Sequence, residues 1–175
     1  MKLLALGAST SSTSINAQLA AYAASLVPNA DVTSYSLAEL NLPIYSEDEE
    51  KANGHPADAQ KFLDAIAAHD GVVLSLAEHN GSYTAAFKNI YDWASRIEQS
   101  VWQGKPMLLL STSPGGRGGV TVLEAGKATF PRMGAELAAS FSLPSYYDNF
   151  SENGITDPEL SAQLNDAVDA FANSL

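Results

Sequence analysis

The sequence predicts an α/β fold with a doubly wound, mostly parallel sheet, and three observations favour it. Short apolar runs alternate along the chain with stretches whose apolar residues recur at helical spacing. Two of these runs, 71–76 and 107–111, are almost continuously apolar, which is typical of central strands covered on both faces. No repeat, linker or change of composition divides the 175 residues. We therefore expect a single domain over residues 1–175.

The first half of the chain supplies three strands and the two helices between them. They are strands at 3–6, 31–36 and 71–76 and helices at 17–26 and 57–69. An irregular segment, 42–56, lies before the second helix and contains the acidic run Glu47-Asp48-Glu49-Glu50. Because like charges repel and stay hydrated, we expect this run to be a solvated loop.

The second half continues the alternation. A helix after residue 82 carries Phe87, Ile90, Tyr91 and Ala94 on one face. Further elements are expected as a strand at 107–111, a helix at about 120–132 and a last strand at 136–141. Asp157 is the expected N-cap of a final helix that has Pro158 at its first position and reaches the C-terminus.

The loop after the first strand, residues 7–16, has the properties of an anion site. It joins a strand to a helix, so free backbone N–H groups and the positive end of a helix dipole meet there. Such a position attracts a phosphate, and its serine hydroxyls can donate further hydrogen bonds. The loop has neither the lysine of a P-loop nor the G-x-G-x-x-G pattern. A solvated loop with an N-cap stays open as the alternative.

Three loops are expected to meet at one edge of the sheet, because all parallel strands end at the same edge. With the flavodoxin-like strand order 2-1-3-4-5, these are residues 9–16, 77–82 and 113–119. The second loop offers an amide, a glycine and the flat side chain of His79, and the third offers successive glycines that let a flat ligand approach the main chain. The three loops together predict a site for a phosphate attached to a planar ring, as in flavin mononucleotide.

Charge and composition exclude several classes of function. The formal net charge of −11 repels nucleic acids and anionic membranes, so we expect neither as a partner. No apolar run approaches the ~20 residues that span a bilayer. The absence of cysteine excludes disulfides and thiolate chemistry and suits a reducing cytosol, where we expect the protein to be. His55 and His69 have no partner at metal-binding spacing, so we expect both at the surface and no metal site.

Three stretches of the chain match three sequence motifs in the same order. Residues 8–16 lie on G-S-x-R-x-x-S-x-N, and residues 77–93 lie on P-E-Y-N-x-S-x-x-x-x-L-K-N-x-x-D-W. Gly104-Lys105-Pro106, a strand and residues 111–119 match G-K-P followed by S-x-S-P-G-G-x-G-G. Over roughly residues 1–145 the chain therefore resembles the NADPH-dependent FMN reductase family, a flavodoxin-like group that includes chromate, quinone and azobenzene reductases. The resemblance implies a three-layer doubly wound sandwich with a five-stranded parallel sheet.

The resemblance also implies a function and a set of contacts. Hydride would pass from NADPH or NADH to FMN and then to a small electron acceptor: a quinone, an azo compound, a metal oxyanion or free flavin. No side chain is implied as catalytic, since the flavin carries the chemistry. The implied phosphate contacts are Ser9, Ser11, Ser14, Ile15 and Asn16. The implied ring contacts are Glu78, His79, Asn80, Gly81, Ser82, Ser113, Gly115 and Gly116. Members of the family are usually homodimers or homotetramers, with the flavin near a subunit boundary.

Arg117 is a candidate contact for substrate. It lies in the glycine loop, where the phosphate of a nicotinamide dinucleotide would approach, although a solvated arginine fits the pattern as well. Three positions depart from the family pattern: Ser11 replaces an arginine, Ala77 a proline and His79 a tyrosine. These changes point to weaker FMN binding or an altered choice of pyridine nucleotide.

Two alternatives stay open. The first is a flavodoxin-type electron carrier, although the first loop lacks the T/S-x-T-G-x-T pattern of those carriers. The second is a degenerate family member that binds FMN weakly, to which the changes at Ser11 and Ala77 point. A response-regulator receiver is excluded because no acidic cluster follows the first strand.

Overall fold

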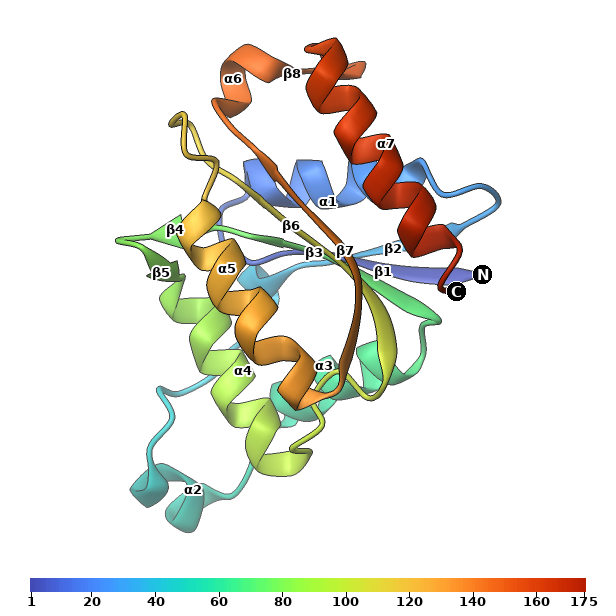
Figure 1. Ribbon diagram of the computed structural model, residues 1–175. Coiled ribbons are helices and arrows are strands. Elements are labelled where there is room, and N and C mark those ends of the chain that lie inside the picture. The colour runs from blue at the N-terminus through green and yellow to red at the C-terminus, as the bar shows by residue number, and fades with distance from the viewer.

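A five-stranded parallel sheet runs through the middle of the molecule, with helices on both faces (Figure 1). The computed structural model describes residues 1–175. The strand order β2-β1-β3-β6-β7 confirms the expected order 2-1-3-4-5. The strands are β1 (Lys2–Gly7), β2 (Asp31–Tyr35), β3 (Gly71–Leu76), β6 (Lys105–Thr112) and β7 (Ala135–Leu143). Every pairing between them is parallel, so their carboxyl ends share one edge.

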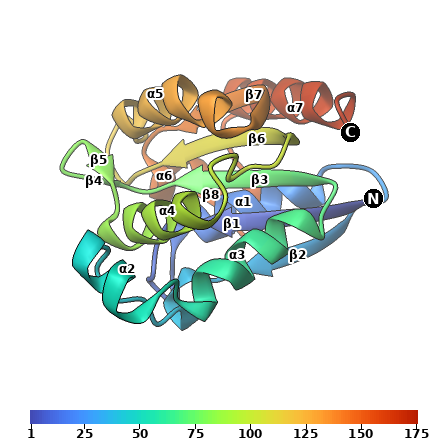
Figure 2. The ribbon, with the colours of Figure 1, turned by 90° about the horizontal axis from the view of Figure 1, so that it is seen from below.

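Two groups of helices cover the two faces of the sheet. One face packs against α1 (Ile15–Ser25) and α7 (Pro158–Ala172). The other packs against α3 (Ala57–Ala67), α4 (Ala85–Ile97) and α5 (Val120–Thr129), and Figure 2 shows α3 and α4 crossing in front of the strands. Asp157 caps α7 by accepting hydrogen bonds from two backbone N–H groups, and Pro158 occupies its first turn, as expected.

Alternation along each strand divides the core into two clusters. In β1, Leu3 and Ala5 point to the α1 face, whereas Leu4 and Leu6 point to the opposite face. All six residues of β3 are buried, because helices cover this central strand on both sides. The almost continuous apolar run in the sequence has this physical cause.

The remaining elements are short. The two 3₁₀ turns are η1 (Leu37–Glu39) and η2 (Phe130–Met133). Two short α-helices, α2 (Glu47–Asn53) and α6 (Tyr146–Asn149), lie outside the main layers. Two small hairpins complete the fold, β4 (Glu78–His79) with β5 (Ser82–Tyr83) and β8 (Phe150–Ser151) with β9 (Gly154–Ile155). None of the helices is both long enough and apolar enough to cross a membrane.

The acidic run at 47–50 is the first turn of helix α2, so the prediction of a loop there is wrong. The Ser46 hydroxyl accepts a hydrogen bond from the Glu49 N–H at 3.1 Å, which caps the helix. Four carboxylates in the first turn also favour the positive end of the helix dipole. No residue of α2 is buried, so the expectation of a solvated segment is correct in that respect.

The two remote histidines differ in their surroundings. His69 is only 9% exposed, and its Nδ1 lies 2.6 Å from the Ala65 carbonyl oxygen, so the prediction of a surface position is wrong. It lies in the short connection between the end of α3 and the start of β3. His55 is exposed, with its Nε2 lying 3.1 Å from Glu50 Oε1.

Candidate functional site

A cavity of about 220 Å³ lies at the edge where β1, β3 and β6 end, and we call it the edge cavity. Residues from all three predicted loops line it. The predicted site residues among them are Ser9, Ser11, Ser14, Ile15, Asn16, Glu78, His79 and Ser113. The other lining residues are Thr13, Ala77, Thr112, Pro114 and Tyr147. The fold therefore brings eight of the predicted residues around one cavity.

The first loop is held by its own hydroxyl groups. The Ser11 N–H donates to Ser9 Oγ at 3.1 Å, and the Thr13 N–H donates to Ser11 Oγ at 3.3 Å. Ser14 caps α1, since its Oγ accepts from the Ala17 N–H at 3.1 Å. The Ser11 and Thr13 hydroxyls also lie 3.4 Å apart and share one hydrogen bond, whereas Ser9 and Ser14 accept from backbone N–H groups and can still donate their own protons.

Backbone donors at the start of α1 are free to bind an anion. The N–H groups of Ser12, Ile15 and Asn16 make no hydrogen bond within the chain. Ile15 and Asn16 form the first turn of α1 and line the edge cavity. Orphan N–H groups and the helix dipole thus act at the same place, which is the arrangement that binds phosphate in other strand–loop–helix units.

Gly7 lets α1 approach the sheet closely. A Cβ at this position would lie 2.4 Å from the Ala17 nitrogen and 2.5 Å from its Cα. Only a residue without a side chain permits this contact, so Gly7 determines where the helix begins. On the other side of the loop, the buried Thr84 hydroxyl donates to the Ala8 carbonyl at 2.8 Å.

The Asn16 side chain ties the first loop to two strands. Its Oδ1 accepts from Ser75 Oγ at 2.7 Å and from the Thr112 N–H at 3.1 Å. Its Nδ2 donates to the Thr112 carbonyl at 3.1 Å, and the residue is 3% exposed. The amide thus positions α1 against β3 and β6, whereas the Asn16 N–H is the group available to an anion.

The second loop is a hairpin rather than an open loop. Asn80 and Gly81 both have positive φ, 52° and 74°, as a type I′ turn requires. The Glu78 carboxylate accepts from the Val122 N–H at 3.0 Å and so caps α5, whose own N-cap, Gly119, has no side chain. This bond fixes one side of the edge cavity to the first turn of α5.

The third loop combines a fixed end with an open end. Gly118 has a φ of 58°, and a Cβ there would lie 2.4 Å from Ser142 Oγ. The hydroxyls of Ser111 and Ser142 both donate to its carbonyl, at 2.7 and 3.0 Å. At Gly115 and Gly116, in contrast, the nearest atom to a Cβ would be 4.0 and 3.9 Å away. Their exposed main chain leaves space for a flat group.

Six predicted residues lie on the loops but do not line the edge cavity. Asn80, Gly81 and Ser82 form the exposed end of the β4–β5 hairpin, and Gly115, Gly116 and Arg117 form the exposed part of the glycine loop. The Arg117 guanidinium donates to Thr121 Oγ1 at 2.9 Å, within its own segment. These six residues belong to the same loops as Glu78, His79 and Ser113, which line the edge cavity, and we call them its rim.

Tyr147 is a lining residue that the sequence analysis missed. It is 71% exposed and comes from α6, far along the chain from the three loops. The chain returns to the site because the Ser145 N–H donates to the Gly115 carbonyl and the Tyr146 N–H donates to the Ser113 carbonyl. No local pattern around residues 144–148 signals this contact.

No lysine or arginine lines the edge cavity. The charged or ionisable lining groups are Glu78, His79 and Tyr147, and Glu78 already bonds the start of α5. Any anion bound there is therefore held by backbone N–H groups, serine hydroxyls and the α1 dipole. This agrees with Ser11 standing where the motif has arginine.

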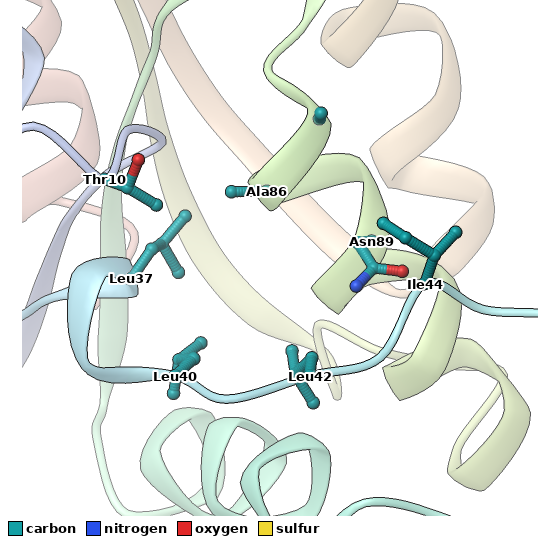
Figure 3. A pocket seen from close by; sticks show the side chains of 8 residues that line it. Thr10, Leu37, Leu40, Leu42, Ile44, Ala86 and Asn89 are labelled. Atoms are coloured by element: carbon teal, nitrogen blue, oxygen red, sulfur yellow. The ribbon is translucent and has the colours of Figure 1, made fainter.

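A second, apolar pocket lies beside the first loop. It has a volume of about 190 Å³. Figure 3 shows Leu37, Leu40 and Leu42 along one side, Ala86 of α4 facing them, and Ile44 beside Asn89 of α4. Thr10, which also lines it, belongs to the same loop as Ser9 and Ser11. We call it the leucine pocket. Asn89 holds its outer segment by bonding the Tyr45 N–H and the Pro43 carbonyl, both at 2.9 Å.

The sequence matches a family and several known proteins. The family described as NADPH-dependent FMN reductase matches over residues 1–148. The chain is 40% identical over 107 residues to the 2-hydroxy-1,4-benzoquinone reductase of Burkholderia sp, covering 60% of this chain. It is 34% identical over 116 residues to an NAD(P)H-dependent FMN reductase of Pseudomonas aeruginosa, covering 66% of this chain. These alignments span 56% and 61% of the two relatives' own lengths.

A solved structure gives a similar result over a longer range. FerB of Paracoccus denitrificans, titled a flavoenzyme NAD(P)H:(acceptor) oxidoreductase, superposes with a TM-score of 0.77 at 26% identity. The superposition covers 98% of this chain and 95% of FerB. The fold found here therefore matches that of a flavoenzyme over nearly its whole length.

Proposed function

The chain belongs to the NADPH-dependent FMN reductase family, and from this premise we propose that it is an NAD(P)H-dependent oxidoreductase that binds FMN at the edge cavity. One observation carries the proposal. Eight residues expected from the sequence to contact FMN line a single cavity, although they come from three separate loops. The cavity sits beside the start of α1, whose free N–H groups suit the phosphate of FMN.

The donors present fit the two chemical parts of FMN. Free N–H groups and serine hydroxyls at the first loop suit a phosphate, with no lysine or arginine needed. The open main chain at Gly115 and Gly116 suits a flat ring, because no side chain there would prevent close approach. When bound, FMN supplies the hydride chemistry, accepting hydride from NAD(P)H and passing electrons to a second substrate.

In this proposal the chain's own residues position the cofactor and polarise it. The first loop and α1 hold the phosphate, and the bonds of Asn16 keep that loop fixed relative to β3 and β6. Glu78 fixes the hairpin on α5, so His79 keeps its place at the cavity wall. Backbone N–H groups near the ring would stabilise negative charge that develops on it. No side chain needs to form a covalent bond with substrate.

The second substrate is a small electron acceptor of the quinone or azo class, and we assign Arg117 to the pyridine nucleotide. Its guanidinium is exposed on the rim and bonded only to a neighbouring hydroxyl, so it can reach a phosphate outside the cavity. The departures at Ser11 and Ala77 make FMN binding weaker than in a member with the full motif. At the wall of the edge cavity, His79 occupies the position where the family motif has a tyrosine.

The proposal extends to assembly and location. We propose a homodimer or homotetramer in the cytoplasm, in which a second copy covers the leucine pocket beside the first loop. The apolar lining of that pocket and the 77% exposure of Ile44 at its margin support this assignment. Removing this exposed apolar surface from water is the driving force that such a contact would use.

The test is an absorption spectrum of the purified protein after FMN loading and gel filtration, followed by anaerobic addition of NADPH and then NADH. We expect retained flavin bands that bleach with one of the two nucleotides and return on addition of a quinone. Retained bands that neither nucleotide bleaches would contradict the proposal and favour an electron carrier. Absence of retained flavin at any loading concentration would instead favour a member that no longer binds FMN.

A further inference from the structure

Tyr147 is the one residue lining the edge cavity that lies outside the three predicted loops and the strands they follow. It belongs to α6, and the backbone holds the start of that helix against the glycine loop. The Ser145 N–H donates to the Gly115 carbonyl at 3.0 Å, and the Tyr146 N–H donates to the Ser113 carbonyl at 3.1 Å. Tyr147 therefore has a fixed place beside the cavity.

The neighbouring ring of Tyr146 supports the ring of Tyr147. Tyr146 stacks on Phe150, with centroids 4.8 Å apart and planes inclined by 20°. Its hydroxyl donates to Gln18 Oε1 at 2.9 Å, which ties α6 to α1. The ring of Tyr147 meets that of Tyr146 at 88°, with centroids 5.5 Å apart. Contacts with both α1 and the glycine loop thus define the position of an exposed side chain.

Tyr147 lies beside the start of α1. Thr13 and Ile15 line the edge cavity together with Tyr147, and the same three residues also line a hollow between α1, α6 and the β8–β9 hairpin. Two cavities thus place Tyr147 next to Thr13 and Ile15. Ile15 is in the first turn of α1 and carries one of the N–H groups that make no hydrogen bond within the chain. The phenol is therefore close to the place where those groups would bind an anion.

The hydroxyl of Tyr147 is free to donate. None of the hydrogen bonds of the chain involves it, whereas the Tyr146 hydroxyl is bonded to Gln18. No lysine or arginine lines the edge cavity, and Ser11 stands where the family motif has an arginine. A hydrogen bond from a phenol to a phosphate oxygen is charge-assisted and so stronger than a bond between neutral groups. The phenol can therefore supply part of what the missing guanidinium would.

We propose that the Tyr147 hydroxyl donates a hydrogen bond to the phosphate of bound FMN and takes the place of the arginine that the first loop lacks. This inference rests on the proposed function for the presence of FMN in the edge cavity. The phenol adds one donor to the backbone N–H groups, the serine hydroxyls and the dipole of α1. Because the contact is with the phosphate, its loss should affect FMN and leave riboflavin, which has no phosphate, unaffected.

The test measures the Kd of FMN and of riboflavin by flavin fluorescence in the wild type and in Tyr147→Phe. Phenylalanine keeps the ring and removes only the hydroxyl, so we expect the Kd of FMN to rise about tenfold and that of riboflavin to stay constant. Tyr22→Phe is the matched control, because Tyr22 lines the hollow beside α1 and not the edge cavity. It should change neither Kd. An unchanged Kd of FMN in Tyr147→Phe, or an equal rise for both flavins, would overturn the proposal.

Ser11→Arg tests whether Tyr147 fills the role of the arginine. The variant restores the residue of the motif and should lower the Kd of FMN in both the wild type and Tyr147→Phe. Because the two side chains would bind the same phosphate, the gain should be larger in Tyr147→Phe, where the phenol donor is missing. Equal gains in the two backgrounds would contradict this replacement.

Inorganic phosphate separates this inference from the proposed function. If FMN binds neither the wild type nor Tyr147→Phe, the proposed function is contradicted, and stabilisation by phosphate then tests the donor alone. A rise in melting temperature with phosphate that is larger in the wild type than in Tyr147→Phe would support the role of the phenol. An equal rise in both proteins, or no rise in either, would overturn it.

Discussion

Helix α1 and the helices on the opposite face of the sheet pack against the strands in different ways. On one face, α1 presents small residues, Ala20, Ala23 and Ala24, to the strands, and Gly7 lets its first turn touch the backbone of β1. On the other face, α3, α4 and η2 bury large rings, among them Phe62, Trp93 and Phe130. We call this the aromatic face. The small residues of α1 let that helix approach the strands closely, whereas the aromatic face buries more apolar area.

This difference has a functional meaning. In the proposed function the start of α1 binds the phosphate of FMN. It must therefore lie within hydrogen-bonding reach of the edge cavity, and its small residues allow the helix to come that close. The aromatic face carries no such requirement, so bulk can supply stability there. Changes on the aromatic face should therefore reduce stability with little effect on FMN affinity. Changes at the start of α1 should reduce FMN affinity more than their effect on stability explains.

The largest expected loss of stability is for Trp102→Ala. Trp102 is fully buried, stacks on Tyr91 at 5.9 Å and packs on Phe130 at 5.1 Å. Removing such a ring leaves a cavity and costs about 3–5 kcal/mol in the free energy of unfolding. Urea unfolding would measure the loss, and Trp102→Phe, which keeps a ring, should lose less. An FMN Kd that weakens in proportion to the stability loss would contradict the separation of the two faces.

Asn16→Ala should cost about 2–4 kcal/mol, because it leaves the Ser75 hydroxyl and the Thr112 N–H buried without partners. It should also weaken FMN binding, since α1 loses its tie to β3 and β6. Asn89→Ala is the matched control: that amide also makes two bonds, but to the segment beside the leucine pocket. Equal effects of the two variants on FMN affinity would show that the Asn16 tie has no special role.

Gly7→Ala should cost about 1–3 kcal/mol by overpacking, because its Cβ would lie 2.4 Å from the Ala17 nitrogen and α1 must move. FMN affinity should fall further than for any change on the aromatic face. Gly116→Ala is the control for stability, since the nearest atom to its Cβ would be 3.9 Å away. Thermal unfolding and flavin fluorescence separate the two effects. Unchanged FMN affinity in Gly7→Ala would contradict the claim that FMN binding requires α1 to lie close to the sheet.

Lowering the pH should weaken the contact between Glu50 of α2 and Arg96 of α4. Hydrogen bonding by His55, and then by Arg96 and Tyr45, holds the pKa of Glu50 below its ordinary value. A carboxyl whose folded pKa is lowered contributes stability above the unfolded pKa of about 4.3, and loses it as the pH falls further. The melting temperature should therefore drop below this pH, and drop less in Glu50→Gln. Glu47→Gln is the matched control, since it removes a carboxylate from the same helix and leaves the Glu50 contacts in place.

Tyr91→Phe should have the smallest effect, within about 0.5 kcal/mol of the wild type or slightly stabilising. The Tyr91 hydroxyl is buried without a hydrogen bond of normal geometry, as is the indole N–H of Trp102. Burial raises the pKa of this phenol to about 12, and the interaction with Trp102 only partly opposes that rise. Removing an unpaired buried polar group costs nothing in hydrogen bonding and relieves its desolvation. A loss of more than 1 kcal/mol in urea unfolding would mean that the hydroxyl does have a partner.

The sequence was sufficient to predict the sheet and the three loops. The continuous apolar runs and the alternation of elements predicted the strands, and the strand order followed from the resemblance to a flavodoxin-like family. Two errors had local signals that could have been used. Ser46 and Glu49 have the spacing of a capping box, which indicates the start of α2. Asn80-Gly81 is the preferred dipeptide of a type I′ hairpin turn.

Other parts of the site had no local signal. The side chain of Asn16 is committed to Ser75 and Thr112 only because β3 and β6 end beside α1. Tyr147 reaches the edge cavity because backbone bonds from Ser145 and Tyr146 hold α6 against the glycine loop. Both depend on tertiary contacts between residues distant in the chain, which a pattern of residues along one segment cannot contain.

The most direct test of the account is the thermal stabilisation of the protein by FMN compared with riboflavin, which lacks only the phosphate. A ligand at 100 times its Kd stabilises the folded state by about 2.7 kcal/mol, so melting temperatures report binding to the native protein. If the donors of α1 bind the phosphate, as proposed, FMN should stabilise the wild type far more than riboflavin does at equal concentration. This difference should shrink in Gly7→Ala. Equal stabilisation of the wild type by FMN and riboflavin would contradict the assignment of the first loop as the phosphate site.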